Sequence, residues 1–280
     1  MKTILIADSG ATKTEWCLLH QGKKRTIITQ GLSPYFLTTA QLIDILDKEL
    51  WKKIKDIDIQ EIYFYGTGCS TKTNNAIVAN AFYQRYKKAK ITIDHDMMGA
   101  AISLCGSTKG VASILGTGSS ACYYNGRTIT QSRTGLGYAL GDEGSGSYMG
   151  RKVLQYYLYQ TFDAELQHAF DTKYNTDRTA ILEQVYKQPF PQRYMATFTK
   201  FLADNRGHYM VENIIEDSLV DFYFAHLIKF KEVWKCPVHF VGGIAYAFKD
   251  VIKNLCTQYG LQLGTIHKRP MDGLVKLYSK

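Results

Sequence analysis

The sequence lacks the features that mark several common protein classes. No apolar stretch is long enough to cross a membrane, and the first one, Ile4 to Ala7, runs directly into Asp8. That stretch is also too short for the apolar core of a signal peptide. No low-complexity segment or long flexible linker interrupts the chain. We therefore expect a folded protein of the cytoplasm with no membrane partner.

The cysteines lack the spacing of a metal centre. None of the six lies two to four residues from another, as zinc and iron-sulfur ligands usually do. Free cysteines behave as small apolar residues and are commonly buried. We expect reduced thiols, most of them in the core, at Cys17, Cys69, Cys105, Cys122, Cys236 and Cys256.

The net charge of +9 is not concentrated in a basic stripe. The lysines of Trp51–Lys55 and Tyr86–Lys90 alternate with apolar residues, which is typical of solvated helix faces. The sequence therefore argues against a nucleic-acid partner, although a basic surface suits an enzyme that collects anionic nucleotides.

A pattern of strand, glycine turn and strand occurs twice. The first copy joins Thr3–Ala7 to Glu15–Leu19, and the second joins Val111–Leu115 to Ala121–Tyr124. In the first half, strands and helices then alternate, which indicates an α/β domain. With 280 residues the chain is long enough for two domains. The repeat predicts a boundary near Cys105–Lys109.

The second half is helical over long stretches before a strand at Val238–Val241 meets Gly242-Gly243. Its apolar spacing predicts helices over Tyr148–Phe162, Arg178–Tyr186, Gln192–Leu202 and Tyr209–Val233.

The first turn, Asp8-Ser-Gly-Ala-Thr-Lys-Thr, has the composition of a phosphate-binding loop. Backbone amides and hydroxyls can donate to phosphoryl oxygens, and Asp8 can orient Mg²⁺ through water. The same residue types also make ordinary β-turns. If the turn binds ATP, the contacts come from Gly10, Thr12, Lys13 and Thr14.

The second turn repeats this chemistry after another apolar strand. Two such hairpins facing each other across a cleft could hold the β- and γ-phosphates from both sides. The expected contacts are Gly116, Thr117, Gly118 and Ser119.

An acidic residue, Asp96, lies between the two turns in sequence and follows the apolar strand at Lys90–Ile93. At the start of a helix it could be only an N-cap. In a nucleotide cleft it could instead accept the proton of an attacking hydroxyl. Asp94 is the alternative base, and we interpret His95 as structural.

Taken in order, the chain's short motifs resemble the BadF/BadG/BcrA/BcrD-type ATPase and N-acetylglucosamine kinase family of the actin, sugar-kinase and Hsp70 superfamily. The resemblance extends over nearly the whole chain. Its motifs are Asp8 to Thr14, Gly31-Leu-Ser-Pro-Tyr, Tyr65-Gly-Thr-Gly-Cys, Asp96-Met-Met-Gly, Leu115-Gly-Thr-Gly-Ser, Gly141-Asp-Glu-Gly-Ser, Val241-Gly-Gly and Pro270-Met-Asp-Gly-Leu.

The resemblance implies a fold and a catalytic base. The fold is the α/β, two-domain, ribonuclease H-like actin/hexokinase fold, with duplicated βββαβα-type domains, here 1–106 and 107–280, around a nucleotide cleft. The base is Asp96 rather than Asp94, and it deprotonates the 6-hydroxyl of a sugar.

The resemblance also implies where sugar and adenosine bind. Gly141–Ser145, including Asp142 and Glu143, would contact the sugar, with Asp142 as the expected hydroxyl acceptor, and Gly242-Gly243 would approach the adenosine. An acidic helix start and a strand-to-helix turn without ligand would have similar sequences. Relatives that bind N-acetylglucosamine commonly have asparagine near the Gly-Leu-Ser segment and after Gly-Thr-Gly-Ser. This chain has other candidate sugar contacts there, namely Ser33, Tyr35 and Ser120.

The implied function is an ATP- and Mg²⁺-dependent kinase that phosphorylates a hydroxyl, expected to be the 6-hydroxyl, of an amino sugar such as N-acetylglucosamine. The alternatives are an ATPase or activator without a sugar substrate, and a nucleotide-binding regulator without catalysis. The chain lacks the cysteines with which BcrA-type activators bridge an iron-sulfur cluster between subunits. Its Cys105 and Cys122 flank the second glycine turn instead. A homodimer is expected only by analogy with the family.

Overall fold

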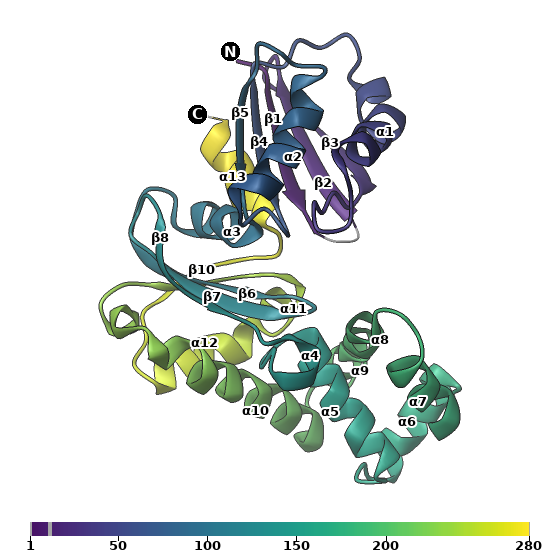
Figure 1. The fold of residues 1–280 in the computed structure, drawn as a ribbon. Coiled ribbons are helices and arrows are strands. Elements are labelled where there is room, and N and C mark those ends of the chain that lie inside the picture. Colours follow the sequence, from purple (N-terminus) through teal and green to yellow (C-terminus); the bar gives the residue numbers. More distant parts are fainter. Residues whose placement is uncertain (1, 11–12, 280) are drawn as a thin grey trace. The chain divides into compact units, whose positions relative to one another are not determined.

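The chain forms two compact units. The computed structural model describes residues 2–10 and 13–279. One unit consists of Met1–Ser107 and Arg269–Lys280, and the other of Thr108–Lys268. Each contains one five-stranded mixed sheet with helices packed against it (Figure 1).

The sheet of the first unit has the strand order β3-β2-β1-β4-β5. The central strand, β1, runs antiparallel to β2 and parallel to β4. Its side chains are buried on both faces, which explains why Ile4–Ala7 is a continuous apolar run and not an alternating one. The strands are β1 (Ile4–Ser9), β2 (Lys13–His20), β3 (Lys23–Gln30), β4 (Glu61–Gly66) and β5 (Lys90–Asp94).

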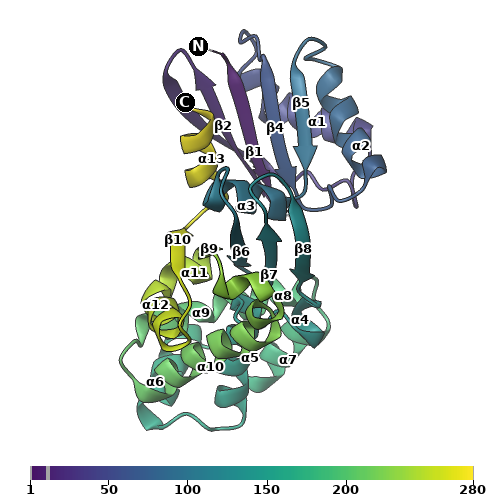
Figure 2. The same cartoon turned by 90° about the vertical axis from the view of Figure 1, so that its left-hand side faces the viewer.

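Helices cover both faces of this sheet (Figure 2). On one face Leu5 and Ala7 share a core with Trp16, Phe64 and Phe82. This is the face of α1 (Thr39–Glu49), the short 3₁₀ helix η1 (Trp51–Lys53) and α2 (Lys72–Tyr83). The opposite face carries α3 (Asp96–Cys105) and α13 (Pro270–Tyr278).

The C-terminal helix α13 departs from the predicted domain 107–280. It belongs to the first unit, where Met271 and Leu274 pack against Ile4 and Ile6 of β1. A Cβ at Gly273 would lie 2.1 Å from the backbone oxygen of Ser103 in α3, so the two helices approach closely. An amphipathic pattern alone cannot tell which sheet a helix will cover.

The second unit repeats the strand arrangement of the first. Its order is β10-β9-β6-β7-β8, with β6 antiparallel to β7 and parallel to β9. The predicted internal repeat is therefore confirmed. The strands are β6 (Gly110–Leu115), β7 (Ser119–Tyr124), β8 (Ile129–Thr134), β9 (Val238–Val241) and β10 (Leu263–His267).

Two of the helices predicted in the second unit are interrupted, whereas the predicted helix Arg178–Tyr186 is confirmed with the same bounds. The predicted helix Gln192–Leu202 is divided at Phe198, and Tyr209–Val233 ends as an α-helix at Ala225 before two 3₁₀ turns. Propensity does not mark either interruption. The elements are α4 (Gly137–Leu140), α5 (Gly146–Leu158), α6 (Ala164–Tyr174), α7 (Arg178–Tyr186), α8 (Pro191–Thr197), α9 (Thr199–Asp204), α10 (Tyr209–Ala225), η2 (Leu227–Lys229), η3 (Lys231–Trp234), α11 (Gly243–Ala247) and α12 (Lys249–Gln258).

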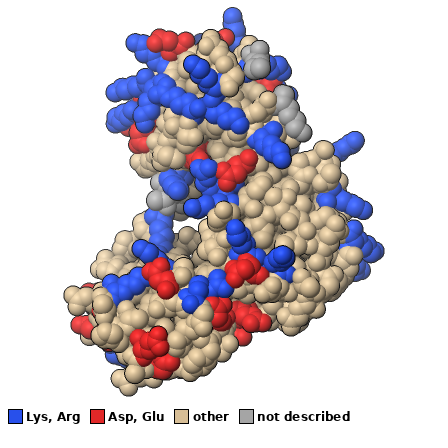
Figure 3. Space-filling model, turned by 180° about the vertical axis from the view of Figure 1, so that it is seen from behind, with Lys and Arg blue, Asp and Glu red and all other residues tan. Residues whose placement is uncertain are grey.

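The burial of the cysteines and the distribution of the charged side chains can both be compared with the sequence. All six cysteines are buried thiols, as expected. Figure 3 shows basic side chains crowded on the first unit, in the upper part of the view, and mixed with acidic ones on the second. The helices that the structure describes include none with the length and hydrophobicity needed to span a bilayer.

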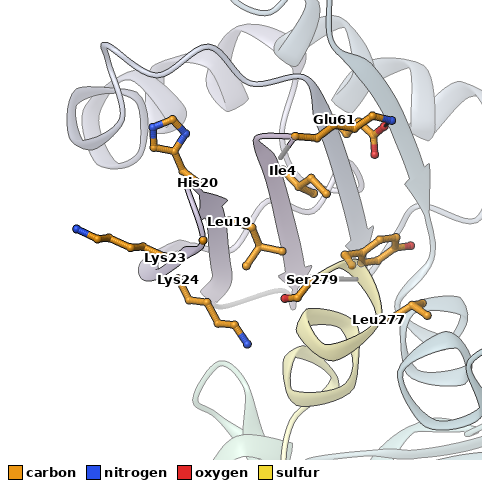
Figure 4. A pocket seen from close by; sticks show the side chains of 11 residues that line it. Ile4, Leu19, His20, Lys23, Lys24, Glu61, Leu277 and Ser279 are labelled. Carbon is orange, nitrogen blue, oxygen red and sulfur yellow. Dashed lines mark hydrogen bonds and ion pairs between the residues drawn. The ribbon is translucent and has the colours of Figure 1, made fainter.

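A cavity of about 510 Å³ lies in the first unit between the β2–β3 hairpin and the end of α13. Leu19 and Ile4 form part of its lining, and Lys23 and Lys24 extend outward from the hairpin (Figure 4). None of the residues predicted to bind nucleotide or sugar lines it. Its size alone therefore does not identify the functional site.

Candidate functional site

The first glycine turn connects β1 to β2. The amide of Gly10 donates to the carbonyl of Lys13 across 3.0 Å, and the Lys13 side chain is exposed. Thr14 is fully buried, with its hydroxyl 2.7 Å from that of Ser9 and 3.2 Å from the Gln30 carbonyl oxygen. Its side chain therefore stabilises the turn and presents no surface to a ligand. Thr12, the remaining predicted contact, lies outside the described residues.

Asp96 is tied to this turn through Thr67. The Thr67 amide donates to the carbonyl of Ser9 across 2.8 Å, and its hydroxyl donates to Asp96 Oδ2, also across 2.8 Å. The N-cap of α3 is His95, whose ring accepts from the Met98 amide, while Asp96 Oδ1 accepts from the Met97 amide. Thr67 thus connects the half-buried Asp96 carboxylate to Ser9 at the end of β1 through two hydrogen bonds.

Asp8, at the end of β1, is an unusual carboxyl group. Burial, reinforced by the negative charges of Asp96 and Glu15, raises the pKa of Asp8 to about 7, while Lys13 acts in the opposite direction. Two carboxylates that repel each other are a suitable donor set for a cation that would neutralise both.

The raised pKa of Asp8 predicts a pH-dependent stability. Between the ordinary aspartate value of 3.8 and about 7 the folded protein binds a proton that the unfolded chain does not, so stability falls as the pH rises through this range. The substitution Asp8→Asn leaves a side chain that is uncharged at every pH in this range. In EDTA at pH 8 it should therefore increase the free energy of unfolding by roughly 2 kcal/mol, a figure reduced for solvent screening, and change it little near pH 4.

Urea unfolding of both proteins across this pH range measures the effect. Asp47→Asn, at an exposed carboxylate on α1, is the control and should produce no such divergence. Parallel pH profiles for wild type and Asp8→Asn would contradict the assignment of this buried charge.

The predicted sugar contacts Ser33 and Tyr35 lie beside the turn that follows β4. A Cβ at Gly68 would be 2.8 Å from the Tyr35 ring and 3.0 Å from the Ser33 hydroxyl. Ser33 is buried, and its hydroxyl has no hydrogen-bond partner among the described residues. Tyr35 is exposed, with its hydroxyl 3.3 Å from that of Ser70. Close packing at Gly68 therefore orders both residues.

The second glycine turn connects β6 to β7 and is held by the start of α5. The Gly116 amide donates to the Gly118 carbonyl across 3.0 Å. The amides of Gly146 and Ser147 donate to the carbonyls of Gly116 and Thr117 across 2.8 and 3.0 Å. The turn is thus joined directly to the segment that follows the Gly-Asp-Glu-Gly-Ser motif.

Two serines follow at the end of this turn. The buried hydroxyl of Ser119 has no partner among the described residues, whereas Ser120 is half-buried. A Cβ at Gly116 would meet nothing within 4 Å, so there is space beside the turn. Open space and an unpaired hydroxyl fit a phosphate, which accepts hydrogen bonds.

Asp142 links the second turn to the acidic motif. Its Oδ1 accepts from the Gly137 amide across 3.3 Å, and the Ser119 amide also donates to its carboxylate. A Cβ at Gly118 or Gly135 would lie 3.0 or 2.2 Å from its carboxylate oxygens. Burial raises the pKa of Asp142, opposed mainly by these amides. The carboxylate therefore contributes chiefly to holding the two segments together.

Glu143 has a different environment from Asp142. Its Oε2 lies 3.2 Å from Nε2 of His226, a residue 5% exposed at the end of α10. The other oxygen, Oε1, receives no hydrogen bond from the described residues. Glu143 is thus anchored at one oxygen and available at the other.

Gly242 packs directly against the second turn, whereas Gly243 does not. Gly242 has φ +128°, and a Cβ there would lie 2.1 Å from the carbonyl oxygen of Leu115. Nothing lies within 4 Å of a Cβ at Gly243. Within the second unit, three motifs that are far apart in sequence thus converge around Gly116–Ser119.

The donor sets fit ATP and Mg²⁺. Residues 2–10 and 13–279 contain no cluster of three or more His, Cys, Asp or Glu suited to a metal. Mg²⁺ does not need one, because it binds one or two carboxylates together with phosphate oxygens and water. Asp8 is a buried carboxylate with a raised pKa, and a nearby cation would stabilise its ionised form.

Sequence reasoning missed two residues of these sites. Thr67 lies in Gly66-Thr67-Gly68, a glycine turn after a strand, and this pattern could have identified it. His226 lies more than eighty residues after Glu143 within a helical segment, and no local pattern marks it.

Comparison with known proteins found similar folds throughout. A protein from Porphyromonas gingivalis, proposed to be an N-acetylglucosamine kinase, is 34% identical, with a TM-score of 0.92 over 99% of this chain and 98% of its own. A second such protein, from Chromobacterium violaceum, is 17% identical, with a TM-score of 0.73 over 99% of both chains.

A more distant match is the ROK-family glucokinase of Streptomyces griseus, solved with glucose and AMPPNP. It is 13% identical, with a TM-score of 0.54 over 98% of this chain and 97% of that one. A comparison with curated proteins found no match. The two structures of lower identity bear on the fold alone, and they confirm the predicted two-domain actin/hexokinase-like architecture.

The family model agrees with the motifs. The model of the BadF/BadG/BcrA/BcrD ATPase family matches residues 7–262, which include both glycine turns, Asp96, the acidic motif and Gly242-Gly243. The chain belongs to the BadF/BadG/BcrA/BcrD ATPase family.

Proposed function

We propose that the protein is an ATP-dependent kinase that phosphorylates a hydroxyl, the 6-hydroxyl in our hypothesis, of an amino sugar such as N-acetylglucosamine. The observation that carries the proposal is the connection of Asp96 to the first glycine turn through Thr67. A carboxylate held beside a phosphate turn suits a base for an attacking hydroxyl. The P. gingivalis relative supports the choice of sugar.

The geometry favours Asp96 over Asp94 as the base. Thr67 and the Met97 amide each donate one hydrogen bond to the Asp96 carboxylate, which leaves acceptor capacity on both oxygens. Asp94 instead accepts from the amide of its neighbour His95 and, among the described residues, makes no hydrogen bond to the turn. In the proposed step the sugar oxygen bonds to the γ-phosphorus, the bond to the β–γ bridging oxygen breaks, and Asp96 takes the hydroxyl proton.

The remaining residues bind and orient in this proposal. Lys13, the amides of Thr117 and Gly118 and the unpaired Ser119 hydroxyl would contact phosphates, while Gly10 and Gly116, whose amides are bonded within their turns, would shape the two loops. Gly242 and Gly243 would contact the adenosine. Mg²⁺ at Asp8 would neutralise phosphate charge when bound. Ser33, Tyr35, Ser120 and Glu143 would contact the sugar, with Asp142 and Thr14 positioning their neighbours. Cytoplasmic location, homodimerisation and the absence of a nucleic-acid partner stay predictions.

A panel of acceptors tests the proposal. ADP release should rise well above the sugar-free rate with one or more of N-acetylglucosamine, glucosamine, N-acetylmuramic acid and glucose, with the first giving the largest increase. ATP hydrolysis that no sugar alters would favour an ATPase or activator. ATP binding without turnover would favour a regulatory protein, and either result would overturn the kinase proposal.

A further inference from the structure

The acidic motif contacts the end of helix α10 through Gly144, which lies against Phe222, and through Glu143, which lies beside His226. A Cβ at Gly144, whose φ is +71°, would lie 2.7 Å from Cβ of Phe222. The Phe222 ring stacks on that of His226 with 4.9 Å between centroids and an angle of 25°. Gly144 thus lets the motif approach α10 closely, and Phe222 fixes the plane of the His226 ring.

The His226 imidazole has one hydrogen-bond partner among the described residues. Its Nε2 lies 3.2 Å from Glu143 Oε2, while its Nδ1 is buried without a hydrogen-bond partner. A buried N–H without an acceptor costs more than a buried lone pair, so the hydrogen belongs on Nε2, where it is donated to Glu143. The ring therefore acts as a fixed donor to one carboxylate oxygen.

This contact separates the roles of the two acids. The Asp142 carboxylate accepts from backbone amides and lies against Gly118 and Gly135, so little of it can reach a ligand. Glu143 is more exposed, and its Oε1 accepts no hydrogen bond from the described residues. An ionised carboxylate only accepts, so the matching ligand group is a hydroxyl or amide N–H.

We propose that His226 is a positioning residue that fixes Glu143 so that its Oε1 accepts a hydroxyl hydrogen from the acceptor substrate, a neutral polyol. The inference rests on the proposed kinase function and adds to it His226, the residue directly after α10, which touches no substrate. Without the Nε2 donor, Glu143 loses its preferred orientation and the acceptor binds less tightly.

Two substitutions of His226 test the idea. His226→Leu removes the donor and should raise the acceptor KM by about tenfold or more, with the KM for ATP unchanged. His226→Gln retains an N–H donor at a similar reach and should return the acceptor KM most of the way to the wild-type value. His208→Leu, which breaks another histidine–carboxylate pair of the same unit, with Asp163, is the control and should leave both KM values unchanged.

A double-mutant cycle separates positioning from general damage. In a Glu143→Ala background, His226→Leu should have no further effect on the acceptor KM, because its route to the substrate is already lost. An additive effect, or equal acceptor KM values for wild type and His226→Leu, would overturn the role of His226 alone. Absence of sugar-stimulated ADP release in the wild type would overturn the kinase proposal and this inference together.

Discussion

Asp96→Asn should lower the rate of phosphoryl transfer by about a thousandfold, within the range that general-base catalysis contributes. Asparagine has nearly the same shape, and its carbonyl oxygen can still accept from Thr67 or from the Met97 amide. The substitution removes the proton acceptor and one of the negative charges that raise the pKa of Asp8, while the shape of the side chain is kept. Because Asp96 is not a proposed phosphate contact, ATP affinity should stay close to that of the wild type.

Single-turnover transfer to the preferred sugar and equilibrium ATP binding measure the two expectations. Asp94→Asn is the matched control, because it removes a carboxylate two residues away that is not bonded to Thr67. It should retain most of the activity. Near wild-type transfer by Asp96→Asn, or a complete loss in Asp94→Asn alone, would show that the base has been assigned to the wrong residue.

Gly242→Ala should destabilise the protein by about 3 kcal/mol or more. The added methyl carbon would lie 2.1 Å from the Leu115 carbonyl oxygen and 2.6 Å from its carbon, and neither backbone atom can rotate away. The φ of +128° adds strain for any residue with a Cβ. Relief requires the end of β6 and the second turn to move, so ATP binding should weaken as well.

The adjacent glycine supplies the control for this substitution. Gly243 begins α11, and a Cβ there would meet nothing within 4 Å, so Gly243→Ala should change the free energy of unfolding by less than about 1 kcal/mol. Urea unfolding of the two variants measures the contrast. Equal stabilities would mean that the close approach to Leu115 is absent in solution.

The repeated strand, turn and strand could be predicted because an apolar run followed by glycine and hydroxyl residues is a local pattern. The edge strands β3 and β8 were harder to identify. Most of their side chains are exposed, so neither has the apolar content by which a buried strand is identified. The placement of α13 also escaped prediction, because its partners lie at the other end of the chain.

Residue roles followed the same division. The glycine turns and Asp96 could be proposed from residue type and order, and their roles stay predictions. The environments of Thr14, Asp142 and His226 depend on contacts made only after folding. Thr14 has a hydroxyl that could bind phosphate, yet it is fully buried. Asp142 could accept from a sugar hydroxyl, yet its carboxylate already accepts from a backbone amide. A sequence specifies which groups are present, whereas burial decides which remain accessible.

The discontinuous first unit has a consequence during translation. The strands of its sheet leave the ribosome early, but α13 follows only after the whole of Thr108–Lys268 has been made. At about 5–20 residues per second this delay is on the order of ten seconds or more. Throughout that interval Ile4, Ile6 and Leu19 lack the helix that covers them. The nascent chain therefore exposes an apolar sheet face for longer than a domain of this size needs to fold. Exposed apolar surface of this kind is what chaperones bind.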